Sequence, residues 1–292
     1  MTMFMMPTPD YERRFGGLQR LFGPEATGRL AAAHVMVAGI GGVGTWCAEA
    51  LARSGVGTIT LVDLDHVSES NVNRQLHALT DTIGQSKVVA MAQRVAGINP
   101  DCVVHAVDDF VTSDNIASLL EGAPDVVIDC TDQVAAKIAM ILEGRLRNIP
   151  VLVCGGAGGK TDPLTLQAGD LSRATHDALL SRLRNVLRRQ HGYPKASQAA
   201  GKPAARVPRM GVWALWLQQP VILPGHWGLA AGTAPDRDTQ GDDADAPDNI
   251  TDGAASLQGL SCAGYGSVVT VTATMGMAAA NRALAVIVGV VR

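Results

Sequence analysis

Four glycines have the spacing of a nucleotide-binding turn: Gly39, Gly41, Gly42 and Gly44. They come directly after the apolar run 35–38 and lead into a helical pattern at 43–54. Glycine lets the backbone approach a phosphate closely, and the first turn of the helix offers free N–H groups. Asp63 follows the next apolar run, where a carboxylate can accept hydrogen bonds from ribose hydroxyls. These residues predict a nucleotide site but do not distinguish a dinucleotide from ATP.

Polar residues after Asp63 favour a nucleotide whose phosphoanhydride is cleaved. They are Asp65, Asn71, Asn73, Arg74, Gln75 and Lys87. A hydride-transfer enzyme needs no such cluster, because its pyrophosphate stays intact. During cleavage, charge builds on the transferred and leaving groups, where Arg can bind oxygens bidentately and Asp can hold Mg²⁺. We predict that the cluster binds ATP and that Arg74 and Lys87 act in catalysis, although either residue alone is typical of a solvated surface.

Two further carboxylates lie at the end of the apolar run 126–130. Asp132 is predicted to hold Mg²⁺ or to position the substrate. The alternative is that Thr131 or Asp132 caps the helix expected from residue 133. For Asp129 a place in the site and a place in the core both stay open.

Short apolar runs alternate with helical patterns through the first part of the chain. The runs lie at 35–38, 58–62, 103–107, 126–130 and 151–154, and the helical patterns at 43–54, 84–97, 113–121 and 133–147. Ser113 or Asp114 is the expected cap of the third helix. This alternation predicts a doubly wound α/β fold with a mostly parallel sheet, in which residues 1–170 form the ATP-binding core.

Residues 171–292 differ in character and are expected to complete the same domain. A basic helix carries Arg182, Arg184, Arg188 and Arg189, which can neutralise nucleic-acid phosphates or simply form a solvated face. Residues 212–223 are predicted to form a strand. The Asp-rich stretch 225–258 is predicted to be a mobile loop within a crossover segment at about 192–258. An apolar helix is expected within 268–291.

The composition, 47% hydrophobic with a net charge of −3, is typical of a globular protein. The N-terminus lacks a basic region followed by an apolar core, so we expect no signal peptide and a cytoplasmic location. Asn281 and Arg282 interrupt the C-terminal apolar stretch, which favours a buried or dimer-facing helix over a membrane span. The five cysteines form no Cys-x-x-Cys pair, so no zinc site is expected. Cys262 is either a buried structural thiol or a residue with a redox or catalytic role.

Several motifs together resemble the E1-like adenylyltransferase superfamily, which includes activators of the molybdopterin and thiamine pathways. These motifs are YERRF, GIGGVG, LVDLD, NVNRQ, GQSK, INP and IDCTD. Four others, YERRFGGLQRLFG, DDFVTSDN, CGGAGGKTDP and SCAGYGS, resemble the branch that dehydrates threonylcarbamoyladenosine in tRNA. The resemblance implies a Rossmann-like adenylation fold. A substrate carboxylate would attack the α-phosphate of ATP, pyrophosphate would leave, and ring closure would expel AMP.

The resemblance also implies roles for particular residues. The four glycines would line the phosphates, Asp63 would bind the ribose, and Asp132 would lie near the metal. The triphosphate would be surrounded by Asn73, Arg74, Gln75 and Lys87. Family members are homodimers, in which Arg13 would reach the partner subunit's ATP site; otherwise it belongs to an ordinary basic helix. The basic helix would bind tRNA, and a cysteine-desulfurase system is an implied partner.

Two other functions remain as alternatives. The first is activation of the C-terminus of a ubiquitin-like sulfur-carrier protein. The lack of Cys-x-x-Cys pairs, and of any cysteine in 211–258, favours the dehydratase branch over it. The second is a nicotinamide-dependent oxidoreductase or a nucleotide-binding module without catalysis, against which the Asn, Arg and Lys cluster counts.

Overall fold

A computed structural model describes residues 10–195, 207–222 and 265–290 of the chain. Their strands form a seven-stranded sheet in the order β3-β2-β1-β4-β5-β7-β6, in which every neighbouring pair is parallel except β6 with β7. The strands are β1 (His34–Ala38), β2 (Thr58–Val62), β3 (Val103–Val107), β4 (Val126–Asp129), β5 (Val151–Cys154), β6 (Leu166–Asp170) and β7 (Trp213–Leu217). The helices are α1 (Tyr11–Phe22), α2 (Pro24–Ala32), α3 (Gly44–Arg53), α4 (Lys87–Ile98), α5 (Ile116–Leu119), α6 (Val134–Arg147), α7 (Ala178–Gln190) and α9 (Val269–Ile287).

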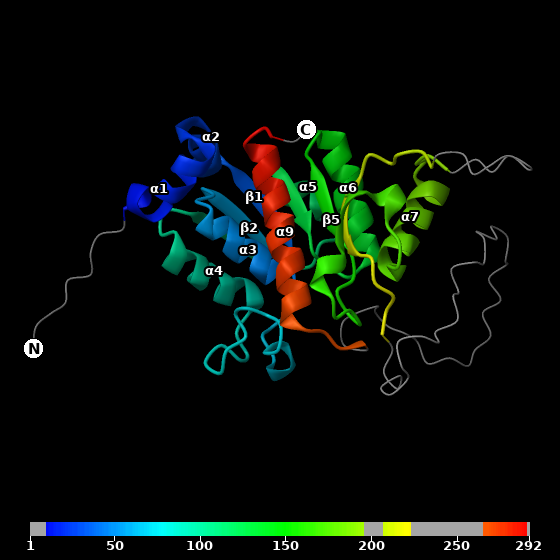
Figure 1. Ribbon diagram of the computed structural model, residues 1–292, viewed down its shortest axis with the longest axis horizontal. Helices are drawn as coiled ribbons and strands as arrows, with labels where there is room; N and C mark the ends of the chain where they lie inside the picture. Colours follow the sequence, from blue (N-terminus) through cyan, green and yellow to red (C-terminus); the bar gives the residue numbers. More distant parts are fainter. Residues whose placement is uncertain (1–9, 196–206, 223–264, 291–292) are drawn as a thin grey trace, which may run out of the picture.

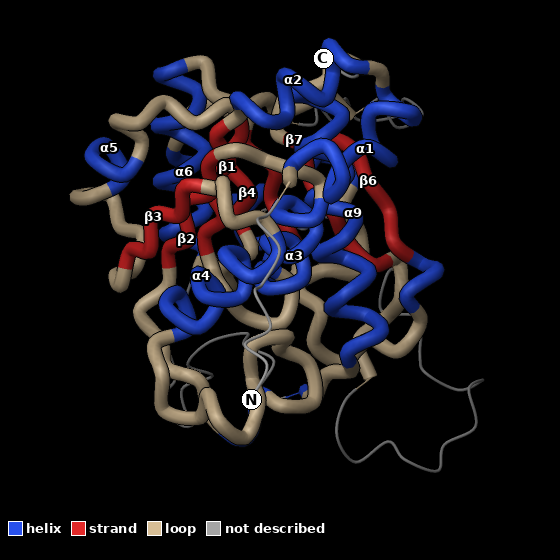
Figure 2. Tube along the Cα trace, turned by 90° about the vertical axis from the view of Figure 1, so that its left-hand side faces the viewer, coloured by secondary structure: helices blue, strands red, loops and turns tan. Residues whose placement is uncertain are grey.

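Alternate residues of each central strand pack against helices on opposite faces of the sheet. Val35 and Val37 of β1 join a core with α2, α3, α4 and α9, whereas Met36 and Ala38 join one with α5 and α6. Figure 1 places α1 and α4 toward one end of the molecule, α7 toward the other, and α9 between them. Figure 2 shows the strands as a layer with helices on both sides. Because both faces are covered, the apolar runs are nearly continuous.

The chain order around β1 creates the crevice in which such folds bind ligands. Val37 of β1 is in register with Leu61 of β2 and with Ile128 of β4. From β1 the chain proceeds to β2 and β3 on one side, and β4 and β5 lie on the other. The carboxyl ends of β1 and β4 therefore flank a topological switch point. The doubly wound, mostly parallel fold expected from the sequence is confirmed.

Helix α9 lies against α3 with small residues at the contact. Gly276, Ala279, Ala280 and Ala283 are fully or almost fully buried. A Cβ atom at Gly276 would lie 2.3 Å from the Val43 carbonyl oxygen and 2.9 Å from the Cys47 nitrogen. The apolar C-terminal stretch is therefore a helix that packs closely against α3. Within the described ranges, no helix is long and apolar enough to cross a membrane.

Some element boundaries differ from those expected. Helix α4 starts at Lys87 rather than 84, because Ser86 bridges to His66 and leads into the helix. Helix α5 is a single turn that begins after Asn115, not a helix over 113–121 capped by Ser113 or Asp114. Strand β6 was not expected, because it is a half-exposed edge strand without an apolar run. The stretch 225–258 lies outside the described residues.

The α3–α9 contact predicts opposite effects for two helical glycines. Gly276→Ala should lower the free energy of unfolding by about 1–3 kcal/mol, because the methyl group would overlap backbone atoms of α3. Gly97→Ala is the control, since a Cβ there meets nothing within 4 Å, and it should raise stability by about 0.5–1 kcal/mol. Urea unfolding measures both. Equal stability of the two variants would contradict this account of the packing.

Candidate active site

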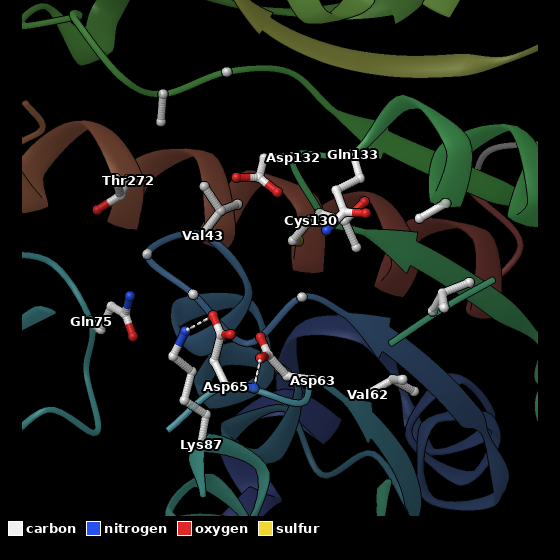
Figure 3. Close-up of a pocket in the computed structure, with 18 of the residues that line it drawn as sticks. Val43, Val62, Asp63, Asp65, Gln75, Lys87, Cys130, Asp132, Gln133 and Thr272 are labelled. Carbon is white, nitrogen blue, oxygen red and sulfur yellow. Dashed lines mark hydrogen bonds and ion pairs between the residues drawn. The ribbon is translucent and has the colours of Figure 1, made fainter. Parts of the chain in front are cut away.

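A pocket of about 400 Å³ lies at the carboxyl ends of the strands and spans the switch point between β1 and β4. It collects most of the residues predicted to bind nucleotide: Gly39, Gly41, Gly42, Asp63, Asp65, Asn71, Arg74, Gln75, Lys87 and Asp132. In Figure 3, Asp132 and Gln133 lie on one side of the cavity, and the Lys87–Asp65 pair lies on the other. Gly44 and Asn73 are not among the lining residues.

The glycine turn is fixed by close contacts within the protein. Gly39 has a φ of 84°, and a Cβ there would lie 2.8 Å from the carbonyl oxygen of Cys130 and from the nitrogen of Thr131. Gly44 begins α3, and a Cβ there would lie 1.8 Å from the Gly39 carbonyl oxygen. Gly39 and Gly44 are thus required by the packing, while Gly41 and Gly42 face the pocket. The α3 N-terminus directed at the turn suits a phosphate.

Asp63 is oriented by the backbone around it. Its carboxylate accepts hydrogen bonds from the N–H of Ile40 at 2.6 Å and of Asp65 at 2.8 Å. Burial raises the pKa of this carboxyl group, and the nearby Lys87 ammonium opposes the rise. A carboxylate retains acceptor capacity beyond two bonds, so Asp63 can still receive a ribose hydroxyl. Val62, Phe110 and Val111 line the same part of the pocket and suit the apolar faces of a base.

Lys87 presents a buried ammonium group to the pocket. The residue is 5% exposed, and its Nζ donates to the Asp65 carboxylate at 2.7 Å. Asp65 is more than half exposed. An ammonium group held at the wall of a cavity is suited to compensate phosphate charge. The structure thus brings together Asp65 and Lys87, two members of the cluster that the sequence predicts to bind ATP.

The NVNRQ segment, residues 71–75, contacts both the pocket and the C-terminal part of the chain. Arg74 donates to the Ser70 carbonyl at 2.7 Å and to Asn73 Oδ1 at 2.9 Å. The Asn73 amide donates to the Ser267 carbonyl at 2.8 Å, so it fastens the segment before α9. Buried Gln75 has an Oε1 atom with no hydrogen-bond partner in the structure. A ligand donor entering the pocket could satisfy that acceptor.

The two carboxylates after β4 have separate environments. Asp132 is exposed and lines the pocket, and neither it nor Thr131 caps α6, whose N-cap residue is Gln133. Asp129 is fully buried and lies 3.1 Å from the buried ammonium of Lys137. Its carboxylate also accepts bonds from the Thr131 backbone and hydroxyl. Burial raises the pKa of Asp129, and Lys137 opposes the rise. Asp129 thus belongs to the core and braces the turn that carries Asp132.

Sequence reasoning missed several features of the pocket. A wall made of Gly155, Gly156, Ala157 and Gly158 closes it after β5, and Thr272 of α9 closes it near Gly42. The CGGAGG letters belong to a motif that carries the family resemblance, but two glycines directly after an apolar run are also a signal of close backbone approach. Thr272 carried no local signal, because its place depends on α9 returning to the first half of the chain.

The arginines of α7 fall into two groups. Arg184 donates to the carbonyls of Leu171 and Ala174, and Arg188 donates to the Pro194 carbonyl. These bonds engage both side chains in holding local backbone. Arg182 and Arg189 are exposed. Consequently, Arg182 and Arg189 are the better placed of the four to meet nucleic acid.

Arg13 and Cys262 are not among the described residues that line the pocket. Arg13 lies exposed on α1, pairs with Asp10 at 2.8 Å and does not line this chain's pocket, so its action across a dimer stays a prediction. Cys262 lies outside the described residues. Among the residues that are described, no three His, Cys, Asp or Glu side chains cluster as metal ligands.

Comparisons with known proteins place this architecture in a family. The ThiF family profile matches residues 11–292. The chain belongs to the ThiF family. This ThiF-family chain is 37% identical to the tRNA threonylcarbamoyladenosine dehydratase of Haemophilus influenzae, over 94% of this chain and 93% of that protein. It is 39% identical to the protein of the same name from Escherichia coli, over 97% and 96% of the two chains.

Solved structures agree with these relatives. The Escherichia coli dehydratase in complex with ATP has a TM-score of 0.76 and 36% identity, and the match covers 97% of this ThiF-family chain and 98% of that chain. The molybdopterin-synthase adenylyltransferase of Salmonella typhimurium is 39% identical, but only over 40% of this chain and 47% of that protein. The resemblance expected from the motifs is therefore confirmed.

Beneath the glycine turn, His77 links stability to pH. It is 2% exposed, and its Nε2 lies 3.1 Å from the Ile40 carbonyl oxygen, which only an N–H at that position can satisfy. Burial lowers the pKa of His77 to about 4; the hydrogen bond to Ile40 opposes this shift, and the positive charge of Lys87 adds to it. Its ring is therefore neutral in the folded protein at pH 7.

Because the folded pKa lies below the unfolded one, protons bind the unfolded state more readily as the pH falls from about 6.5 toward 4. The His77 contribution is fully present at neutral pH, and about 2 kcal/mol should be lost between pH 7 and pH 5. Urea unfolding of the wild type and of His77→Gln at both pH values isolates this effect. The variant should lose that much less stability on acidification; equal losses in both proteins would contradict the assignment.

Proposed function

We propose that this chain is an ATP-dependent dehydratase that cyclises threonylcarbamoyladenosine in tRNA. The observation that carries the proposal is one pocket that combines a glycine turn, two cationic side chains and an exposed carboxylate. Arg74 and Lys87 line the pocket together with the glycine turn, and Asp132 lies across the cavity from Lys87 (Figure 3). Similarity over nearly the full length to proteins named as this dehydratase, one of them bound to ATP, supports the substrate and the nucleotide.

The pocket supports adenylation followed by ring closure. ATP would lie with its ribose at Asp63 and its phosphates at the glycine turn. The threonyl carboxylate attacks the α-phosphorus, a new C–O–P linkage forms, and the bond to pyrophosphate breaks. Arg74 and Lys87 stabilise the charge that develops on the leaving pyrophosphate. An atom of the same modification then attacks the activated carbonyl carbon, a ring forms, and AMP leaves.

The donor set also fits one magnesium ion brought in with ATP. Mg²⁺ is commonly bound through one or two carboxylates together with phosphate oxygens and waters. Asp132 is an exposed carboxylate in the pocket wall and would hold the ion; Asp65 is already paired with Lys87. When bound, magnesium would neutralise phosphate charge.

Several further parts of the proposal concern partners. Arg13 of one subunit would complete the ATP site of its partner in a homodimer. A cysteine-desulfurase system would be a functional partner, and the reaction would take place in the cytoplasm, where tRNA is modified. The partial match to a molybdopterin-synthase adenylyltransferase motivates the one competing function, activation of a ubiquitin-like C-terminus.

The reaction itself is the first test. With ATP, Mg²⁺ and tRNA carrying threonylcarbamoyladenosine, the wild type should remove one water from that nucleoside, as seen by mass spectrometry after a mild digest. Arg74→Ala and Asp132→Ala should each lower AMP release about 100-fold or more, because they remove charge stabilisation in the transition state.

Arg20→Ala and Asp101→Ala serve as controls, because Arg20 and Asp101 are exposed and lie outside the pocket. Pyrophosphate exchange that depends on a small ubiquitin-like protein, with no change in the tRNA nucleoside, would support the competing function instead. Near-normal turnover of both pocket variants would refute the assignment of Arg74 and Asp132.

The two exposed arginines of α7 predict a separable tRNA surface. Arg182→Glu or Arg189→Glu should weaken tRNA binding about 10-fold without changing ATP affinity. Because one phosphate contact is lost, the slope of log affinity against log salt concentration should become shallower by about one. Arg20→Glu on α1 has the same charge change and should bind tRNA normally. Filter binding over a series of salt concentrations measures this. Unchanged affinity and slope in both α7 variants would exclude this face.

A further inference from the structure

Lys160 is a buried charged residue that the proposed reaction does not use. It is 3% exposed and follows the glycine wall of the pocket in the chain. Its ammonium group donates to the carbonyl oxygen of His176 at 2.7 Å, to that of Leu217 at 3.5 Å, and to that of Gln219. An ammonium group has three N–H donors, so these acceptors use its full capacity.

The three carbonyls belong to two segments that are far apart in sequence, one at His176 and one at Leu217 and Gln219. Leu217 ends β7, and the Gln219 side chain accepts bonds from the N–H groups of Thr161 and Asp162, each at 3.0 Å. The Lys160 side chain therefore binds the main chain at Gln219, and the Gln219 side chain binds the main chain next to Lys160. These reciprocal bonds fix the end of the wall that is more distant from β5.

The remaining carbonyl, that of His176, connects Lys160 to the end of the wall near β5. His176 has a φ of 54°, an uncommon conformation for a residue with a side chain, and it directly precedes Asp177. The Asp177 carboxylate accepts from the N–H of Gly156 at 2.9 Å and from that of Leu180 at 2.9 Å, which caps α7. Lys160, His176, Asp177 and Gly156 thus close a ring of contacts around the wall.

The wall depends on such contacts, because its own sequence restricts it little. Three of its four residues are glycines, which have the widest conformational freedom. A Cβ atom at Gly155 would lie 2.1 Å from the Asp177 carboxylate, so the two segments meet without an intervening side chain. Main-chain bonds at its ends run from Gly155 to Leu215 and from Gly159 to Gly266.

Burying this charge is energetically unfavourable, which argues for a role beyond filling space. Burial lowers the pKa of Lys160, and the nearby Asp177 carboxylate opposes that shift. A methionine of similar length would occupy the same volume without desolvating an ammonium group. What methionine cannot do is draw three carbonyl oxygens to one point.

We propose that Lys160 is a positioning residue that sets the glycine wall of the pocket at the distance the reacting substrate needs. The inference rests on the proposed function for its kinetic consequence. The wall lies on the β5 side of the switch point, whereas the ribose ligand Asp63 and the apolar residues suited to a base lie on the side of β2 and β3. Loss of Lys160 should therefore affect turnover more than nucleotide binding.

The test compares Lys160→Met with Lys160→Arg and with Lys195→Met, an exposed lysine after α7. Lys160→Met should lower kcat about 10–100-fold, as a wall displaced by about 1 Å would, while the Kd for ATP changes less than about 3-fold. Lys160→Arg keeps the charge and the donors and should recover part of kcat. Lys195→Met should behave as wild type.

Hydrogen exchange gives a readout that does not depend on the reaction. In Lys160→Met, amides of residues 155–162 should exchange at least about 10-fold faster, and those of α3 should not change. If wild-type protein failed to dehydrate the tRNA nucleoside, the proposed function would fall, while the exchange data would still decide the role of Lys160.

Two results would overturn the inference. One is wild-type kcat with unchanged exchange at 155–162 in Lys160→Met. The other is a parallel loss of kcat, ATP affinity and protection throughout the molecule, which would indicate general destabilisation. Should Lys160→Met not fold, Lys160→Gln, which keeps two donors without the charge, is judged by the same criteria.

Discussion

The pocket depends on the absence of a side chain at Gly39. The backbone there turns with a positive φ and approaches the end of β4 so closely that a Cβ would lie 2.8 Å from Cys130 and Thr131. That contact brings the glycine turn, the Asp63 carboxylate and the turn bearing Asp132 to one edge of the sheet. A methyl group at this position would force the two strand ends apart. The glycine turn and the Asp132 carboxylate would then be separated.

Around this contact, charged side chains in the interior are supplied with partners. Asp129 is paired with Lys137, and Lys137 also donates to the Cys154 carbonyl at the end of β5. Glu49 on α3 receives Arg94 from α4 and Arg53 from its own helix. Removing one member of a buried pair leaves an uncompensated charge, so such pairs tie the fold to one arrangement. Asp129 and Lys137 join the ends of β4 and β5 beside the pocket, and the Glu49 pairs join α3 to α4.

The same architecture serves relatives with different substrates, so the differences between them lie in what surrounds the shared turn. The match to a molybdopterin-synthase adenylyltransferase covers less than half of this chain, whereas the matches to dehydratases extend through the basic helix, β7 and α9. Of those later elements, α7 and α9 contribute Leu179 and Thr272 to the pocket lining, and α7 also carries the exposed arginines. We therefore expect the contacts that select the substrate to lie mainly after residue 154, and those that bind ATP mainly before it.

The sequence by itself determined strands β1 to β5, helices α3, α4 and α6 to within a few residues, the glycine turn between β1 and α3, the cluster from Asp65 to Lys87 and the family. These features are written in consecutive residues, because periodicity and motif spacing are local properties. Only the tertiary structure decided the ionic partner of Asp129, the engagement of Arg184 and Arg188 with backbone carbonyls, and the bond from Asn73 to Ser267, 194 positions away. It also decided strand β6 and the glycine wall. Such contacts depend on which distant segments the folded chain brings together, and the spacing of residues along the sequence does not contain that information.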